Sequence, residues 1–174
     1  MNKPSRYSGV SIINHWVTTV LVIAMLVLGW TAGSAPAEVT EAYVMGIHIS
    51  LGFFVFLFIL WRTAYRLYEG FPETIGETKI ERVMAYWVHR LLLVFLVLQV
   101  FSGPLYLFTE NEGVNVFGWF TIYVPLESLA AIHELMEWVH VTLGVYLLPI
   151  LLVLHLLGAF KHFLTADYTT PADL

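Results

Sequence analysis

The 174-residue sequence is more apolar than soluble domains are. Hydrophobic residues make up 59% of it and charged residues 12%. Soluble domains carry about 25% charged residues, so half that fraction indicates a chain solvated by lipid. There are no cysteines, which excludes disulfides, iron–sulfur clusters and the attachment motif of covalent c-type haem. The net charge of −5 gives no indication of a nucleic-acid partner, and we expect none.

Four long apolar segments fill most of the chain. Each approaches or exceeds the ~18–20 residues that cross a bilayer core. We predict helices over residues 9–32, 40–68, 81–109 and 129–165. Short or moderate connections make neighbours in sequence antiparallel neighbours in space. The expected fold is therefore an all-α membrane protein, a four-helix transmembrane up-down bundle, with residues 1–174 forming a single domain in contact with lipid.

The basic residues are confined to three places: before the first segment, around the second connection and at the end of the fourth segment. They are Lys3, Arg6, Arg62, Arg66, Lys79, Arg82, Arg90 and Lys161. The first and third connections contain none of these residues and carry only acidic ones, Glu38, Glu41, Glu110, Glu112, Glu127, Glu134 and Glu137. Cytoplasmic loops accumulate Lys and Arg. We therefore expect both termini to be cytoplasmic in a bacterial inner membrane.

The first apolar segment has a competing interpretation. A basic start, an apolar stretch and Ala35-Pro36-Ala37 also fit a secretory signal with its cleavage site. The stretch is longer than the ~7–15 residues of a signal core, so we expect it to be retained as the first helix.

The third connection is rich in aromatic residues. Phe117, Trp119, Phe120 and Tyr123 lie in it, and aromatic side chains favour the membrane interface. We expect this connection to fold back on the outer membrane surface as a partly ordered cap.

Four of the seven histidines form a pattern in depth. Ionisable groups inside a membrane are costly and usually functional. His15 is expected at the inner end of the first helix and His48 at the outer end of the second. His140 and His155 lie in the fourth, 15 positions apart. In an α-helix this separation is roughly 22 Å along the axis and about 60° around it. His15 thus matches His155 in depth, and His48 matches His140. For any one of them alone, a hydrogen bond to a neighbouring helix is an equal alternative.

Glycines accompany three of the four histidines. Gly52 and Gly144 follow His48 and His140 by one turn, Gly158 follows His155, and Gly29 lies near the depth of the outer pair. A flat macrocycle between helices needs a close backbone approach, which glycine permits. Close packing of membrane helices is the alternative explanation.

Two imidazoles from opposing helices favour haem over a bare metal ion. Tetrahedral zinc needs more ligands than such a site offers, whereas a porphyrin iron needs only two axial ones. The pattern predicts two haem b groups. His15 and His155 would hold the inner iron, and His48 and His140 the outer one. Since both axial positions are then filled, the chemistry left is electron transfer.

The other three histidines are predicted to have different roles. His133 lies 22 residues before the inner ligand of its helix, roughly 33 Å, so it belongs at the outer surface. His89 could replace an inner ligand or contact a haem propionate. His162, with Lys79 nearby, could contact a propionate or a quinone carbonyl, or could be an ordinary interfacial histidine.

Several short motifs occur here in an order typical of one family. They are Arg6-Tyr7, His15-Trp16, His48-x-x-x-Gly52, Leu60-Trp61-Arg62, Val116-Phe117-Gly118-Trp119-Phe120 and Lys161-His162-Phe163. In these motifs the chain resembles the prokaryotic cytochrome b561 family of dihaem membrane proteins over nearly its whole length. The resemblance implies haem b on the same four histidines. It also implies exchange of electrons with ubiquinone or another quinone near His162 and Lys79.

Two features differ from the usual family pattern. One residue more than usual separates His140 from His155, and Pro149 lies between them. A kink or bulge near this proline would absorb the extra residue. Ile49 stands where a basic residue often follows the ligand of the second helix.

Three functions remain open from sequence. The first is electron transfer between a periplasmic redox protein and the quinone pool. The second is oxidation of superoxide with delivery of electrons to ubiquinone, and the third is a haem-free anchor or proton relay. Superoxide is an anion that positive potential would attract. Seven Glu and no Lys or Arg on the outer connections favour a redox partner with a basic docking face.

Overall fold

The computed structural model describes residues 8–71, 76 and 78–165, and the side chains of residues 162 and 165 lie outside this description. The elements in chain order are α1 (Gly9–Gly33), α2 (Glu38–Glu69), α3 (Lys79–Thr109), β1 (Val114–Val116), β2 (Phe120–Ile122), η1 (Glu127–Ile132), α4 (His133–Thr142), η2 (Leu143–Leu147) and α5 (Leu148–Thr165). The first three helices begin and end within two residues of their predicted bounds.

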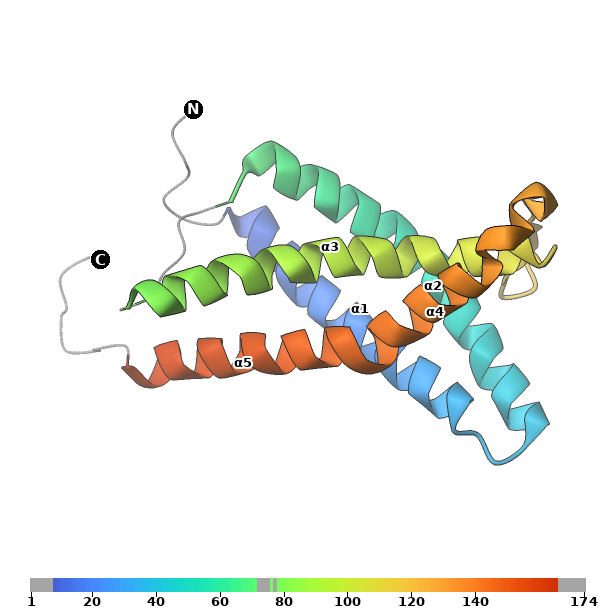
Figure 1. Ribbon diagram of the computed structural model, residues 1–174, viewed down its shortest axis with the longest axis horizontal. Helices are drawn as coiled ribbons and strands as arrows, with labels where there is room; N and C mark the ends of the chain where they lie inside the picture. Colours follow the sequence, from blue (N-terminus) through green and yellow to red (C-terminus); the bar gives the residue numbers. More distant parts are fainter. Residues whose placement is uncertain (1–7, 72–75, 77, 166–174) are drawn as a thin grey trace.

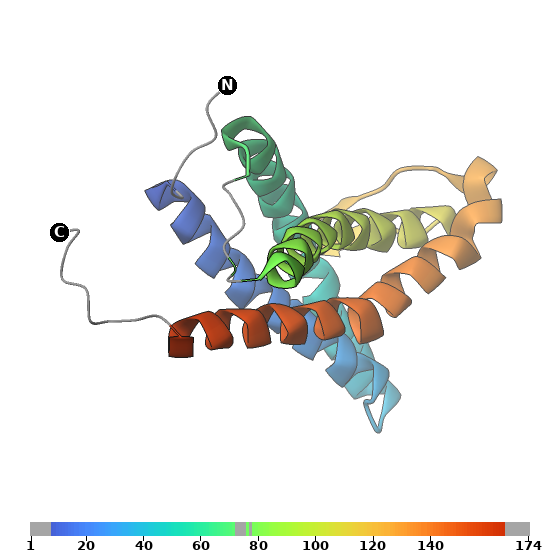
Figure 2. The ribbon, with the colours of Figure 1, turned by 60° about the vertical axis from the view of Figure 1, so that its left-hand side comes forward.

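The long helices run alternately up and down (Figure 1). The start of α1, the end of α2, the start of α3 and the end of α5 lie at one end of the bundle, here called the terminal end. The β1–β2 hairpin lies at the opposite end, here called the hairpin end, and a second view shows the same arrangement (Figure 2). Four helical stretches are long and apolar enough to cross a membrane. The predicted all-α, four-helix membrane bundle is confirmed.

Two helices start where a hydroxyl group caps the backbone. Ser8 Oγ accepts a hydrogen bond from the Ser11 N–H, and Thr78 Oγ1 accepts one from the Glu81 N–H. Such caps satisfy amide donors that the first helical turn leaves unpaired. They fix the starts of α1 and α3 at the terminal end.

The fourth helical stretch is not a single α-helix. It begins two residues earlier than predicted, as the 3₁₀ segment η1, and a π-helical turn, η2, separates α4 from α5. The π turn ends two residues before Pro149, whose nitrogen has no proton to donate to the helix. A π turn adds one residue to a helix. The bulge that the sequence predicted between His140 and His155 is therefore present.

The third connection forms an ordered cap on α2. Strands β1 and β2 pair antiparallel, and left-handed backbone at Phe117 and Gly118 closes the tight turn between them. Ser50 Oγ of α2 accepts from the Phe117 N–H at 3.0 Å. Phe117 also stacks on Phe54, with ring centroids 6.4 Å apart. These contacts hold the hairpin against the bundle beside His48.

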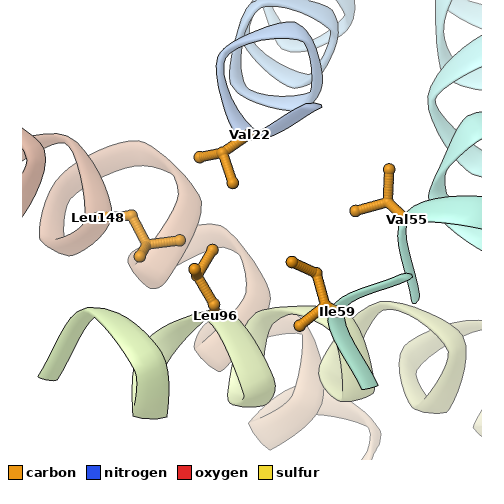
Figure 3. Close-up of a cluster of buried hydrophobic side chains, with 5 residues drawn as sticks. All are labelled: Val22, Val55, Ile59, Leu96 and Leu148. Carbon is orange, nitrogen blue, oxygen red and sulfur yellow. The ribbon is translucent and has the colours of Figure 1, made fainter. Parts of the chain in front are cut away.

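A small apolar cluster lies at the middle of the bundle (Figure 3). It contains one or two residues from each long helix: Val22, Val55, Ile59, Leu96 and Leu148. Most of them lie seven or eight residues from the nearest histidine of their own helical stretch, which is two turns or about 10 Å. This apolar cluster therefore separates the two levels at which the histidines lie.

Truncation in this cluster is expected to destabilise the bundle. Leu148 is 1% exposed, so Leu148→Ala should lower the free energy of unfolding by about 2–5 kcal/mol through lost contacts and a cavity. Denaturant unfolding in detergent micelles measures it. Leu156→Ala is the matched control on α5, because Leu156 is 62% exposed and faces the lipid. An equal effect of the two variants would contradict the position assigned to the cluster.

Candidate functional site

At the hairpin end, two imidazoles from different helices face each other. His48 of α2 and His140 of α4 have ring centroids 6.2 Å apart and nearly perpendicular planes. Both residues are partly buried. The sequence predicts that these two residues lie at the same depth, and in the structure they do.

At the terminal end, three imidazoles come together instead of two. The ring centroid of His155 in α5 lies 6.0 Å from that of His15 in α1 and 5.2 Å from that of His89 in α3. His15 and His89 are exposed and His155 is partly buried. This site is therefore more open than the one at the hairpin end.

The separations fit two ligands on one metal ion. With metal–nitrogen bonds of about 2 Å, imidazoles on opposite sides of an ion have centroids roughly 6 Å apart. The pairs His48–His140 and His15–His155 meet this requirement, at 6.2 and 6.0 Å. The pair His89–His155, at 5.2 Å, is about an ångström short. The planes of two axial imidazoles can adopt any relative rotation, so the interplanar angles present no obstacle.

The donor set suits haem better than a bare ion. Within residues 8–71, 76 and 78–165, no group of three or more His, Cys, Asp or Glu side chains is arranged to hold a metal ion. A two-imidazole site needs a group that supplies the equatorial ligands itself, as porphyrin does. The two helices that carry a histidine pair, α1 with α5 or α2 with α4, do not pack closely against each other. Close backbone packing joins α1 to α2 and α3 to α4 and α5.

His140 is held in place by α3. Its Nδ1 lies 3.1 Å from the Gln99 carbonyl oxygen and 3.2 Å from Ser102 Oγ. The Gln99 side-chain amide lies 3.4 Å from Nε2 on the other side of the ring. Ser102 is 2% exposed, so these contacts are sequestered from solvent.

Glycines give both imidazoles of the hairpin-end site their space. A Cβ at Gly103 of α3 would lie 2.9 Å from His140 Cε1, and a Cβ at Gly29 of α1 would lie 3.4 Å from His48 Cε1. Cβ contacts under 3.0 Å essentially do not occur, so any larger residue at position 103 would displace the ring. The predicted importance of Gly29 is consistent with its contact to His48.

The other predicted glycines make different contacts. A Cβ at Gly52 would meet Met25 Cε, and one at Gly144 would meet the Gln99 side-chain nitrogen at 3.1 Å. Their role in haem packing stays a prediction. Gly103 was missed in the sequence, although it lies with Gln99 and Ser102 in a polar interruption of an otherwise apolar segment.

His133 lies at the hairpin end, away from both sites. Its Nδ1 is 3.2 Å from Thr109 Oγ1 and its Nε2 is 3.2 Å from a Glu110 carboxylate oxygen. Its ring stacks on Tyr106 at 4.8 Å between centroids. Both nitrogens thus contact the end of α3 and tie α4 to it, while the non-ligand role of His133 stays a prediction.

The predicted quinone contacts lie at the terminal end. Lys79 is the first residue of α3 and is exposed. His162 belongs to α5, but its side chain lies outside the described residues. Lys161 beside it forms an ion pair with Glu81 of α3 at 2.6 Å, which ties these two helix ends together.

A four-helix membrane bundle with facing histidine pairs at two levels is the arrangement expected of a membrane cytochrome b of the electron-transfer class. The chain belongs to the prokaryotic cytochrome b561 family, whose family model matches residues 6–171. It is also similar to "Cytochrome b561 homolog 2" of Escherichia coli (strain K12). The identity is 27% over 171 residues, covering 97% of this chain and 90% of that protein. The family implies binding of haem b.

Gly103→Ala is expected to lower the haem content of the purified protein. The added methyl group would push the His140 ring out of its position, so about one haem per chain should be lost if His140 is a haem ligand. Gly33→Ala is the matched control, because a Cβ there meets nothing within 4 Å. The pyridine haemochrome assay measures the haem content. Full haem content in Gly103→Ala, or an equal loss in the control, would contradict the role of Gly103.

Proposed function

We propose that this protein is a dihaem cytochrome b that carries electrons between a periplasmic redox protein and the quinone pool. The carrying observation is the pair of facing imidazoles at each end of the bundle, with centroids 6.2 and 6.0 Å apart. Haem b bound by two imidazoles supplies one-electron transfer and has no open iron position for a substrate.

The proposed haem sites lie at two levels of the bundle, and a different pair of histidines would serve each. His48 and His140 would hold the haem iron at the hairpin end, and His15 and His155 would hold it at the terminal end. The apolar cluster around Ile59 separates the two levels and keeps water out of the space between them. His140 and His155 belong to one helical stretch, roughly 22 Å apart along it, so a single element sets the distance between the sites.

The charge distribution supports an orientation and a partner. Every Lys and Arg in the described part of the chain lies at the terminal end, whereas the seven Glu of the first and third connections are exposed at the hairpin end. Since Lys and Arg accumulate in cytoplasmic loops, the terminal end would face the cytoplasm of a bacterial inner membrane. An acidic periplasmic end attracts a redox protein with a basic docking face and repels anions such as superoxide.

The quinone would bind at the terminal end. Lys79 and the more open imidazole site are there, and the family resemblance implies contacts from Lys79 and His162. A lysine ammonium group can donate a hydrogen bond to a quinone carbonyl. Ubiquinone is the first candidate, and other quinones have the same carbonyl chemistry.

Haem stoichiometry tests the ligand assignment. The wild-type protein should bind two haem b per chain, visible as a sharp α-band after dithionite reduction. His140→Ala and His155→Ala should each retain about one, because each removes one ligand pair, and the spectrum should differ between them. His133→Ala is the control and should retain two. A colourless wild type would refute the proposal, and loss of haem in His133→Ala would refute the ligand assignment.

Stopped-flow kinetics separates the electron conduit from superoxide oxidation. The reduced protein should be oxidised by a quinone, and the rate with a basic redox protein should fall as ionic strength rises. Rapid reduction of the oxidised protein by superoxide, retained at high salt, would favour the superoxide oxidase alternative.

A further inference from the structure

We infer that Ser102 and the backbone carbonyl of Gln99 are positioning groups for the hairpin-end site. They fix the tautomer of His140, so that Nε2 is the nitrogen available to the haem iron. This inference rests on the proposed function, because it concerns the surroundings of one proposed ligand. Neither group touches the metal itself.

The hydrogen-bond pattern identifies which ring nitrogen carries the proton. The Gln99 carbonyl oxygen, 3.1 Å from Nδ1, can only accept a hydrogen bond. Ser102 Oγ donates its single proton to that same carbonyl at 3.1 Å. It therefore presents a lone pair to Nδ1, 3.2 Å away. Both neighbours of Nδ1 are acceptors, so Nδ1 is protonated. The lone pair of the neutral ring lies on Nε2, which faces the donor nitrogen of the Gln99 side-chain amide at 3.4 Å.

Gly103 allows the His140 ring to reach the Gln99 carbonyl oxygen. In an α-helix the carbonyl of Gln99 pairs with the N–H of Gly103, four residues later. The His140 ring occupies the space that a side chain at position 103 would take, since a Cβ there would lie 2.9 Å from Cε1. The Gln99 carbonyl, which already accepts from the Gly103 N–H and from the Ser102 hydroxyl group within its own helix, thus accepts a further hydrogen bond from a neighbouring helix.

The hairpin-end and terminal-end sites differ in the hydrogen bonds that their imidazole rings form. In the described part of the chain, the rings of His15 and His155 form no comparable hydrogen bond to a backbone carbonyl or hydroxyl group. Hydrogen bonding at the remote nitrogen orients an imidazole ligand and raises its basicity. A more basic ligand stabilises the ferric state. The contacts from α3 therefore lower the midpoint potential of the hairpin-end haem and strengthen its retention.

The test compares Ser102→Ala with Ser102→Thr in the haem-loaded protein. Removing the hydroxyl group should raise the midpoint potential of one haem and weaken its retention roughly ten-fold. The EPR signal of that low-spin ferric haem should shift as well. Threonine restores the hydroxyl group and should return all three towards wild type. Thr18→Val is the matched control and should leave both haems unchanged, because within the described residues the buried Thr18 hydroxyl bonds only the Asn14 carbonyl.

A measurement on the wild type guards against misfolded variants. Pulsed EPR of protein containing ¹⁵N-labelled histidine should detect a strongly hydrogen-bonded proton on the remote imidazole nitrogen of one haem. Two haems with an unchanged potential and EPR signal in Ser102→Ala would overturn the inference and leave the proposed function intact. A wild type without haem would instead overturn the proposed function.

Discussion

The spacing of two histidines on one interrupted helix sets the geometry of the whole bundle. His140 and His155 lie in α4 and α5, on either side of the π turn η2, and each must meet a partner from another helix because an isolated imidazole in lipid is costly. His48 meets the first and His15 the second. The up-down order of the helices, which the short connections favour, brings the start of α1 and the start of α2 to opposite levels.

The apolar cluster and the two histidine levels depend on each other. Ile59 and Leu148 are fully buried or nearly so, although much of the surface of these helices faces lipid. The hydrophobic effect does not drive helices together in lipid, so packing contacts and polar pairs do. The cluster supplies the packing between the levels, and the hydrogen bonds between His140 and α3 supply polar interactions at the hairpin-end level.

The sequence predicted the elements and the pairing of levels because both follow from periodicity and length. Apolar length gave four helices, and the rise of 1.5 Å per residue gave the matching depths of the four histidines. Pro149 indicated the bulge, but its location as a π turn depends on how α4 and α5 pack against α3. The β1–β2 hairpin was expected only as a partly ordered cap, since its contacts to Ser50 and Phe54 join distant segments.

The contacts of His140 were not predictable in the same way. Gln99, Ser102 and Gly103 interrupt an apolar segment, and without the rotation of α3 they are indistinguishable from residues that serve helix packing. The approach of His89 to His155 likewise depends on the angle between α3 and α5. The contacts of His140 and the approach of His89 to His155 both depend on how whole helices are rotated against each other, and no local sequence pattern predicts that rotation.

The distance between the two haem irons tests the central claim most directly. Pulsed EPR on the oxidised wild-type protein measures the coupling between two low-spin ferric centres. Two centres held by one helix at the levels of His140 and His155 should lie about 20 Å apart. A single centre, or two centres separated by a clearly different distance, would contradict the two-level arrangement on a shared helix.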